Sequence, residues 1–163
     1  MRKTAYIETS IVSYLTAKPS LDVRAVAWHQ ITAQWWSFAR PDYDLFTSEI
    51  VLVEAGRGDV DASRRRLACL KGIPELRVDE EAQALAERLI TEGAMPETAS
   101  VDALHIAISA VHAMDYLLTW NCRHIDNAAT KPLMRSICAA AGYRCPEICT
   151  PMELLPEDAE NVP

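Results

Sequence analysis

The chain lacks any apolar run near the roughly 18 residues of a membrane span. Its N-terminus also lacks the apolar core, about 7–15 residues long, of a signal peptide. We therefore expect a cytoplasmic protein without a membrane segment. There is no internal repeat, linker or low-complexity tract, and 163 residues with 24% charged side chains fit one globular domain.

Cysteine does not occur in a metal-binding pattern. The five cysteines are scattered, and Cys145 and Cys149 stand four apart around Pro146 rather than at the two-residue gap of a zinc knuckle. This spacing favours free, reduced thiols.

Positive charge is also scarce. The net charge is −7, but the segment from Cys145 onward contains five acidic residues and no lysine or arginine, so residues 1–144 carry only −2. This balance excludes a strongly basic protein that coats nucleic acid. It remains compatible with a nuclease that has a local basic rim.

Short β-like runs alternate with helical ones, which is typical of a parallel sheet with crossover helices. We expect strands at 3–8, 44–47, 76–78, 116–119 and 148–149. We expect helices at 22–39, 48–54, from 60, at 80–92, 98–113 and 132–142, with short helical turns from 10 and at 150–153. In the 22–39 helix, Trp28, Ile31, Trp35 and Phe38 form one apolar stripe.

Acidic residues are predicted to meet at one edge of this sheet. Glu8 ends the first strand, Glu54 lies on the helix after the second, and Asp102 begins the helix before the fourth. Asn121 follows the fourth strand directly, with Asp126 five residues later. In an open α/β sheet, ligands bind outside the carboxyl ends of the strands, which is where these groups converge.

Each acid alone also has a purely structural explanation. Glu8 can cap the turn at Ser10, Glu54 can be a solvated helix residue, and Asp102 can stabilise a helix start. For Asp102 the helix pattern favours a site. The stripe of Val101, Leu104, Ile108 and Val111 predicts the apolar face, and Asp102 shares the other side with His105 and Ser109.

A hard divalent cation would remove the repulsion among three crowded carboxylates. Mg²⁺ and Mn²⁺ prefer oxygen ligands, so carboxylates with an amide oxygen suit them. Such an ion lowers the pKa of a bound water and stabilises charge on an attacked phosphate.

Four fragments in order resemble one known family. They are "YIETSIVSYL", "SEIVLVEAGRGD", "DALHIAISAVHAMDYLLTWNCRHIDN" and "CTPMELL". Together they resemble PIN-domain proteins, in the branch of virulence-associated (VapC-like) toxins of toxin–antitoxin pairs. The resemblance covers about residues 3–155, and implies a PIN-like nuclease domain over 1–155 with an acidic, flexible tail over 156–163.

The resemblance implies a three-layer α/β/α sandwich on a parallel sheet of four to five strands, and metal-dependent RNA cleavage. The family's acidic quartet falls on Glu8, Glu54, Asp102 and Asn121, and the first three imply ligands for Mg²⁺ or Mn²⁺. Ser10 matches the hydroxyl that often holds the first acid.

Two positions depart from the family pattern. Glu8 stands where Asp is usual, and Asn121 stands where Asp is frequent. Asp126 restores a charge near Asn121 if the loop folds back. His105 and His124 are possible catalytic helpers, or histidines packed by their helix.

An RNA substrate also requires cations along its backbone. The candidates are Arg57, Arg64, Arg65, Arg66, Lys71, Arg123, Lys131 and Arg135. The arginine triplet is equally compatible with a solvated helix face. Trp36 lies off the apolar stripe, where it can stack a base or face a partner.

The family implies two further partners, a second copy of the chain and a cognate antitoxin that blocks the acidic cleft. Two other functions remain open. One is a metal-poor PIN-like module that binds RNA or protein, and the other is an α/β hydrolase or phosphatase with a carboxylate nucleophile. The latter lacks a strong candidate for the lysine that it needs near its site.

Overall fold

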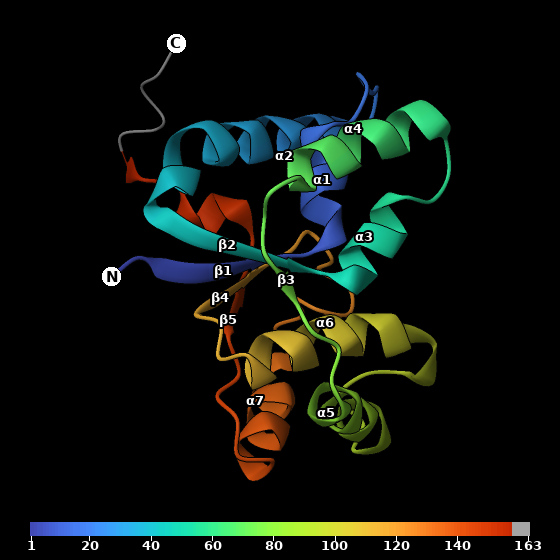
Figure 1. The fold of residues 1–163 in the computed structure, drawn as a ribbon, viewed down its shortest axis with the longest axis vertical. Helices are drawn as coiled ribbons and strands as arrows, with labels where there is room; N and C mark the ends of the chain where they lie inside the picture. The colour runs from blue at the N-terminus through green and yellow to red at the C-terminus, as the bar shows by residue number, and fades with distance from the viewer. Residues whose placement is uncertain (158–163) are drawn as a thin grey trace.

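A five-stranded sheet forms the centre of the protein, in a computed structural model that describes residues 1–157 (Figure 1). All strand pairs are parallel, and the order across the sheet is β3-β2-β1-β4-β5. The strands are β1 (Lys3–Ile7), β2 (Tyr43–Ser48), β3 (Glu75–Leu76), β4 (Tyr116–Leu118) and β5 (Glu147–Cys149). The predicted parallel sheet is confirmed, although the third strand is shorter than expected.

Helices cover both faces of the sheet, which confirms the three-layer α/β/α architecture. In Figure 1, α1 to α4 lie on one side and α5 to α7 on the other. The helices are α1 (Thr9–Leu15), α2 (Val23–Gln34), α3 (Glu49–Ala55), α4 (Val60–Leu70), α5 (Glu80–Thr91), α6 (Ser100–Val111) and α7 (Lys131–Ala140).

Within residues 1–157, no helix has the length and apolar character to span a membrane. The five cysteines are free thiols. Most of the expected acidic tail, residues 158–163, lies outside the described part of the chain.

Local signals in the sequence account for several helix boundaries. The side chain of Asp59 accepts a backbone N–H and caps α4, as expected. Gly142 follows α7 with φ at +88°, a conformation that glycine adopts without strain. The predicted capping box of Thr150 and Glu153 is present, and it opens a 3₁₀ turn, η4 (Pro151–Leu154).

The helix expected at 22–39 is not one continuous α-helix. The α-helical part ends at Gln34, and a π-helical turn, η1 (Trp35–Ala39), and a 3₁₀ turn, η2 (Arg40–Asp42), follow. A π-helix turns less per residue than an α-helix, so the expected stripe is broken there. Trp35 is fully buried, whereas Phe38 is 47% exposed. The prediction that Phe38 continues the buried stripe is wrong.

The apolar face predicted for the 98–113 helix is also wrong in part. Val101 is 40% exposed, while His105 and Ser109 are fully buried in α6. The helix is rich in alanine, and the small side chains of the Ala103 and Ala107 positions pack in the core. The polar side of this helix therefore points into the protein.

Asp115 joins three strands at their amino-terminal ends. Its carboxylate accepts hydrogen bonds from the backbone N–H of Thr4 at 3.0 Å, the Thr4 hydroxyl at 3.1 Å, Lys3 at 3.1 Å and Arg144 at 3.4 Å. Its backbone carbonyl accepts from the N–H of Glu147 in β5 at 2.9 Å. These bonds, the Thr4 N–H first, lower the pKa of Asp115 to about 2.

We predict that Asp115→Asn lowers the free energy of unfolding by about 1–3 kcal/mol at neutral pH, because charged hydrogen bonds are lost. Since the carboxyl pKa is lower in the folded state, this stability is present above about pH 4 and is lost as the pH falls toward 2. Urea denaturation across this range measures the difference between the two proteins. Asp44→Asn, which removes an exposed ion pair with Arg2, is the control and should change little. A deficit that stays constant in acid contradicts the assignment.

Candidate functional site

Glu8 lies immediately after β1 and is buried, with only 5% of its surface exposed. Its Oε2 accepts from the Ser10 backbone N–H at 3.2 Å, the Ser10 hydroxyl, and the Thr119 hydroxyl at 2.7 Å. The first bond makes Glu8 the N-cap of α1, as one interpretation expected. The Ser10 hydroxyl also accepts from the N–H of Trp120 at 2.8 Å, which ties this turn to the end of β4.

Glu54 is not a solvated helix residue. It projects from α3, and its Oε1 accepts from the Thr9 hydroxyl at 2.6 Å and from His105 Nε2 at 2.8 Å. Partial burial raises the pKa of the Glu54 carboxyl, but the His105 and Thr9 hydrogen bonds and the nearby charges, including Arg57, outweigh it. The net effect lowers the pKa, so Glu54 is ionised at neutral pH.

His105 connects Glu54 to the interior. Its ring is fully buried, and Nδ1 shares a hydrogen bond of 2.8 Å with the Tyr6 hydroxyl, which in turn contacts the Ser48 hydroxyl at 2.7 Å. Burial lowers the pKa of His105, yet the bond to Glu54 and the charges of Glu8, Glu54 and Asp102 produce a net increase. Burial raises the pKa of Tyr6, and the two glutamates add to this effect, so the phenol keeps its proton.

Three of these groups are close enough to hold one metal ion. Glu8, Glu54 and His105 each offer one ligand atom, and these atoms lie within 4.8 Å of one another. They come from the end of β1, from α3 and from α6, so the fold brings together residues that are far apart in sequence. Two carboxylate oxygens suit Mg²⁺ or Mn²⁺, and an imidazole nitrogen suits transition metals. The donor set therefore fits a divalent ion without fixing its identity.

Unused oxygen atoms remain on both glutamates. Every hydrogen bond to the Glu8 carboxylate within residues 1–157 uses Oε2, and every one to Glu54 uses Oε1. Each carboxylate is thus fixed by one oxygen and keeps the other for a ligand.

A second histidine, His124, lies beside this cluster and contacts both Asp102 and Asn121. Asp102 Oδ2 contacts His124 Nδ1 at 2.9 Å, and Asn121 Oδ1 accepts from the backbone N–H of His124 at 3.0 Å. Within residues 1–157, Asp102 is not one of the three groups that share the metal-sized space. The structure places His105, expected only as a helper, third in this group, where its two ring nitrogens already have Glu54 and Tyr6 as hydrogen-bond partners.

Asp126 has a different partner. Its Oδ1 accepts from Lys131 Nζ at 2.6 Å, and both side chains are largely buried. Lys131 also reaches the carbonyl of Ile148 in β5. The charge of Asp126 is therefore compensated by Lys131.

The expected RNA-binding arginines fall into two groups. Arg64 pairs with Asp61, Arg65 donates to the carbonyl of Thr16, and Arg66 donates to the carbonyls of Ala55 and Arg57. The bonds of Arg65 and Arg66 tie α4 to its neighbours, whereas the Arg64–Asp61 pair lies within α4.

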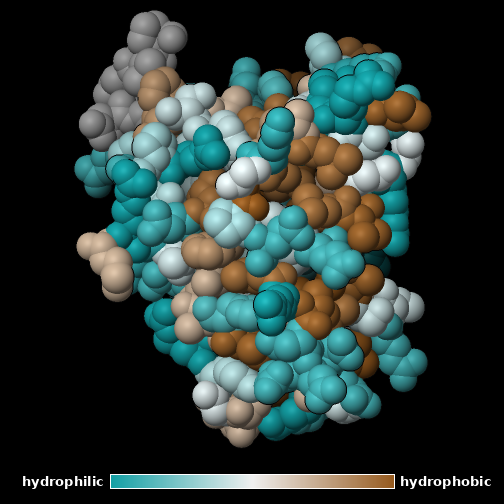
Figure 2. Space-filling view, viewed as in Figure 1, coloured by the Kyte–Doolittle hydropathy of each residue, from teal (hydrophilic) through white to brown (hydrophobic). Residues whose placement is uncertain are grey.

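Arg57 and Arg123 have exposed side chains, as Arg64 does. Arg57 lies beside Glu54, on an open groove of about 490 Å³ whose walls include Val53, Val101 and Leu104. Figure 2 shows hydrophobic side chains gathered where α3 and α6 face each other.

Four residues of the hydrogen-bond network were not predicted as part of the site, namely Tyr6, Thr9, Ser48 and Thr119. Thr9 comes two residues after the end of β1, and Thr119 directly follows β4, which are the places where the carboxylates were sought. Tyr6 lies inside β1 and Ser48 is the last residue of β2, and the sequence gives no sign that their hydroxyls form a chain to a histidine.

The chain matches no family model, and searches of curated proteins and of solved structures also give no match.

We predict that Tyr6→Phe lowers the free energy of unfolding by about 1–3 kcal/mol, because it leaves buried polar atoms of His105 and Ser48 without a partner. Chemical denaturation measures the change. Tyr14→Phe is the matched control, since the Tyr14 ring packs against Trp28 and its hydroxyl has no hydrogen-bond partner within residues 1–157. Equal stability of the two variants would show that the Tyr6 hydroxyl does not support His105.

Proposed function

We propose that this protein is a metal-dependent endoribonuclease of the PIN-like, VapC-like toxin type, which hydrolyses RNA phosphodiester bonds. The observation that carries the proposal is the group of buried Glu8, half-buried Glu54 and buried His105 at the carboxyl edge of a parallel sheet. The order of sequence fragments that resemble this family supports it, as does the agreement of the fold with the expected sandwich.

The unused oxygens of Glu8 and Glu54 are the first ligands that the site offers to Mg²⁺ or Mn²⁺. Such an ion would lower the pKa of a water molecule and offset the negative charge of the phosphate under attack. Ser10 and Thr119 hold Glu8 in place, and Thr9 and His105 hold Glu54. These bonds fix the carboxylates before any ligand arrives.

Asp102 and His124 supply proton transfer in this scheme. If Asp102 accepts from His124 Nδ1–H, it fixes the tautomer in which Nε2 takes a proton. Asn121 holds the backbone of His124 and so orients the ring. Arg57 and Arg123 provide exposed positive charge for the RNA backbone.

A second candidate function has the same fold but no catalytic activity. The buried charges of Glu8 and Glu54 are already compensated by hydroxyl groups and by His105, so the network needs no metal to be stable. This observation favours a PIN-like module that binds RNA or a protein. In both cases a cognate antitoxin and a second copy of the chain are the partners that the resemblance implies.

We expect the purified protein to cleave a fluorescently labelled structured RNA in the presence of Mn²⁺, and to stop when EDTA is added. Glu54→Gln and Asp102→Asn should each lower the rate by at least about 100-fold, because a metal ligand or the base support is lost. Glu49→Gln is the matched control, since Glu49 is an exposed acid on the same helix α3.

Cleavage at equal rates by all four proteins would indicate a contaminating nuclease and contradict the proposal. RNA binding without cleavage by the wild type would favour the second candidate.

A further inference from the structure

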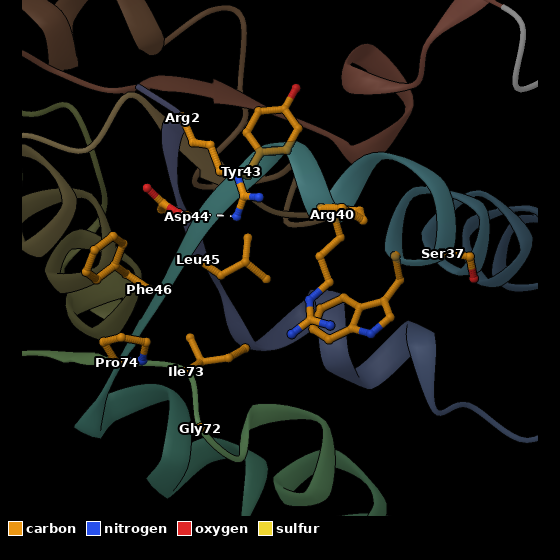
Figure 3. A pocket seen from close by; sticks show the side chains of 12 residues that line it. Arg2, Ser37, Arg40, Tyr43, Asp44, Leu45, Phe46, Gly72, Ile73 and Pro74 are labelled. Atoms are coloured by element: carbon orange, nitrogen blue, oxygen red, sulfur yellow. Dashed lines mark ion pairs between the residues drawn. The ribbon is translucent and has the colours of Figure 1, made fainter.

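A groove of about 680 Å³ lies along the first half of β2 (Figure 3). It begins at Arg2 and Tyr43, at the amino-terminal ends of β1 and β2, whereas Glu8 and Glu54 follow the carboxyl ends of these strands. The other walls come from η1 and η2 and from the loop before β3. The groove is therefore separate from the candidate metal site.

The groove runs along an open strand edge. β1 pairs with β2 from Tyr43 to Phe46, but β3 pairs only with Thr47 and Ser48. Within residues 1–157, the outer edge of β2 before Thr47 has no strand partner.

The backbone groups of Leu45 point to this open edge. The N–H of Thr47 points outward to the carbonyl of Pro74, and residues two apart in a strand point their backbone groups to the same side. The N–H of Tyr43 donates to the carbonyl of Arg40. The carbonyl of Tyr43 and the N–H and C=O of Leu45 therefore remain available for a partner.

Natural sheets usually protect such an edge with charge, proline or a covering loop. Here Pro74 and the charged Asp44 lie along the groove, and large apolar side chains line it beside them. Leu45 and Phe46 point to opposite sides of β2, as neighbouring residues of a strand must, and Figure 3 shows Ile73 beside Leu45. An added strand would therefore find an apolar contact for side chains on either of its faces.

The charge of the groove is positive. Arg40 lies over the ring of Trp36, with 4.6 Å between the guanidinium carbon and the ring centroid. No carboxylate pairs with Arg40 within residues 1–157, whereas Arg2 has a long contact of 3.9 Å with Asp44. The stacked guanidinium is held in place and is complementary to a carboxylate.

We propose that the outer edge of β2 binds an extended segment of a partner protein by strand addition, with an acidic side chain of that segment at Arg40. The N–H and C=O of Leu45, which have no strand partner on this side within residues 1–157, match a peptide backbone, which a nucleic acid does not offer. Alternate apolar side chains of the segment would contact Leu45 and Ile73. This proposal does not depend on the nuclease function, because the two sites use opposite ends of the strands.

The probe is a phage-displayed library of random 12-residue peptides, selected against the immobilised full-length chain. We expect the enriched peptides to contain an acidic residue flanked at alternate positions by apolar residues. The affinity of one such synthetic peptide is then measured for the wild type, for Arg40→Gln, which removes the charge, and for Leu45→Pro, which removes the edge N–H. Both variants should weaken binding at least about tenfold.

Two controls keep the test independent of folding. Arg24→Gln removes an exposed arginine on α2 and should bind as the wild type does. A peptide with N-methyl groups on alternate amides should bind the unaltered protein at least about tenfold more weakly, because it cannot extend the sheet.

Three results would overturn the proposal. The first is that the selection enriches no peptide, or that affinity is unchanged when the peptide binds the two variants and when the N-methylated peptide binds the wild type. The second is displacement of the peptide by single-stranded oligouridylate, which would indicate a nucleic-acid site. The third is a dimer of the chain that Leu45→Pro converts to monomer in sedimentation, which would assign the edge to a second copy.

Discussion

The carboxylate of Glu8 must be compensated because it is buried directly after the central strand of the sheet. Ser10 and Thr119 provide this compensation, and in doing so they join the start of α1 to the end of β4. Glu54 meets the same requirement through Thr9 and through a histidine that is itself held from the interior. These hydrogen bonds organise the part of the carboxyl edge that holds Glu8 and Glu54, while Asp102 and Asp126 have His124 and Lys131 as their own partners.

The sequence predicts much of the fold because parallel strands and their crossover helices have strong local patterns. The sequence pattern fails where tertiary packing determines which face of a helix is buried. Phe38 turns outward because the helix continues as a π-turn, which no periodicity indicates. In α6 the alanines let the backbone pack closely, so the face of His105 is buried rather than that of Val101.

For the site, the convergence of Glu8 and Glu54 follows from topology alone. The role of His105 depends on the Tyr6 hydroxyl, whose partner no sequence pattern reveals.

The two ends of the sheet perform different physical tasks. At the amino-terminal end, Asp115 joins β1, β4 and β5 through charged and backbone hydrogen bonds, and the short β3 leaves the edge of β2 open beside Arg40. At the carboxyl end, polar side chains are fixed by one atom each and keep another for a ligand. Because the groove and the carboxylates lie at opposite ends of the strands, a partner at one end does not contact the groups at the other.

The central claim is that Glu8 and Glu54, with His105 beside them, form a place for a divalent cation. A crystal of the protein soaked in Mn²⁺, with diffraction recorded at a wavelength sensitive to manganese, tests it most directly. The account predicts an anomalous peak at about 2.0–2.4 Å from carboxylate oxygens of both Glu8 and Glu54. A map without a peak between these carboxylates, or with manganese only at surface acids elsewhere, would contradict it.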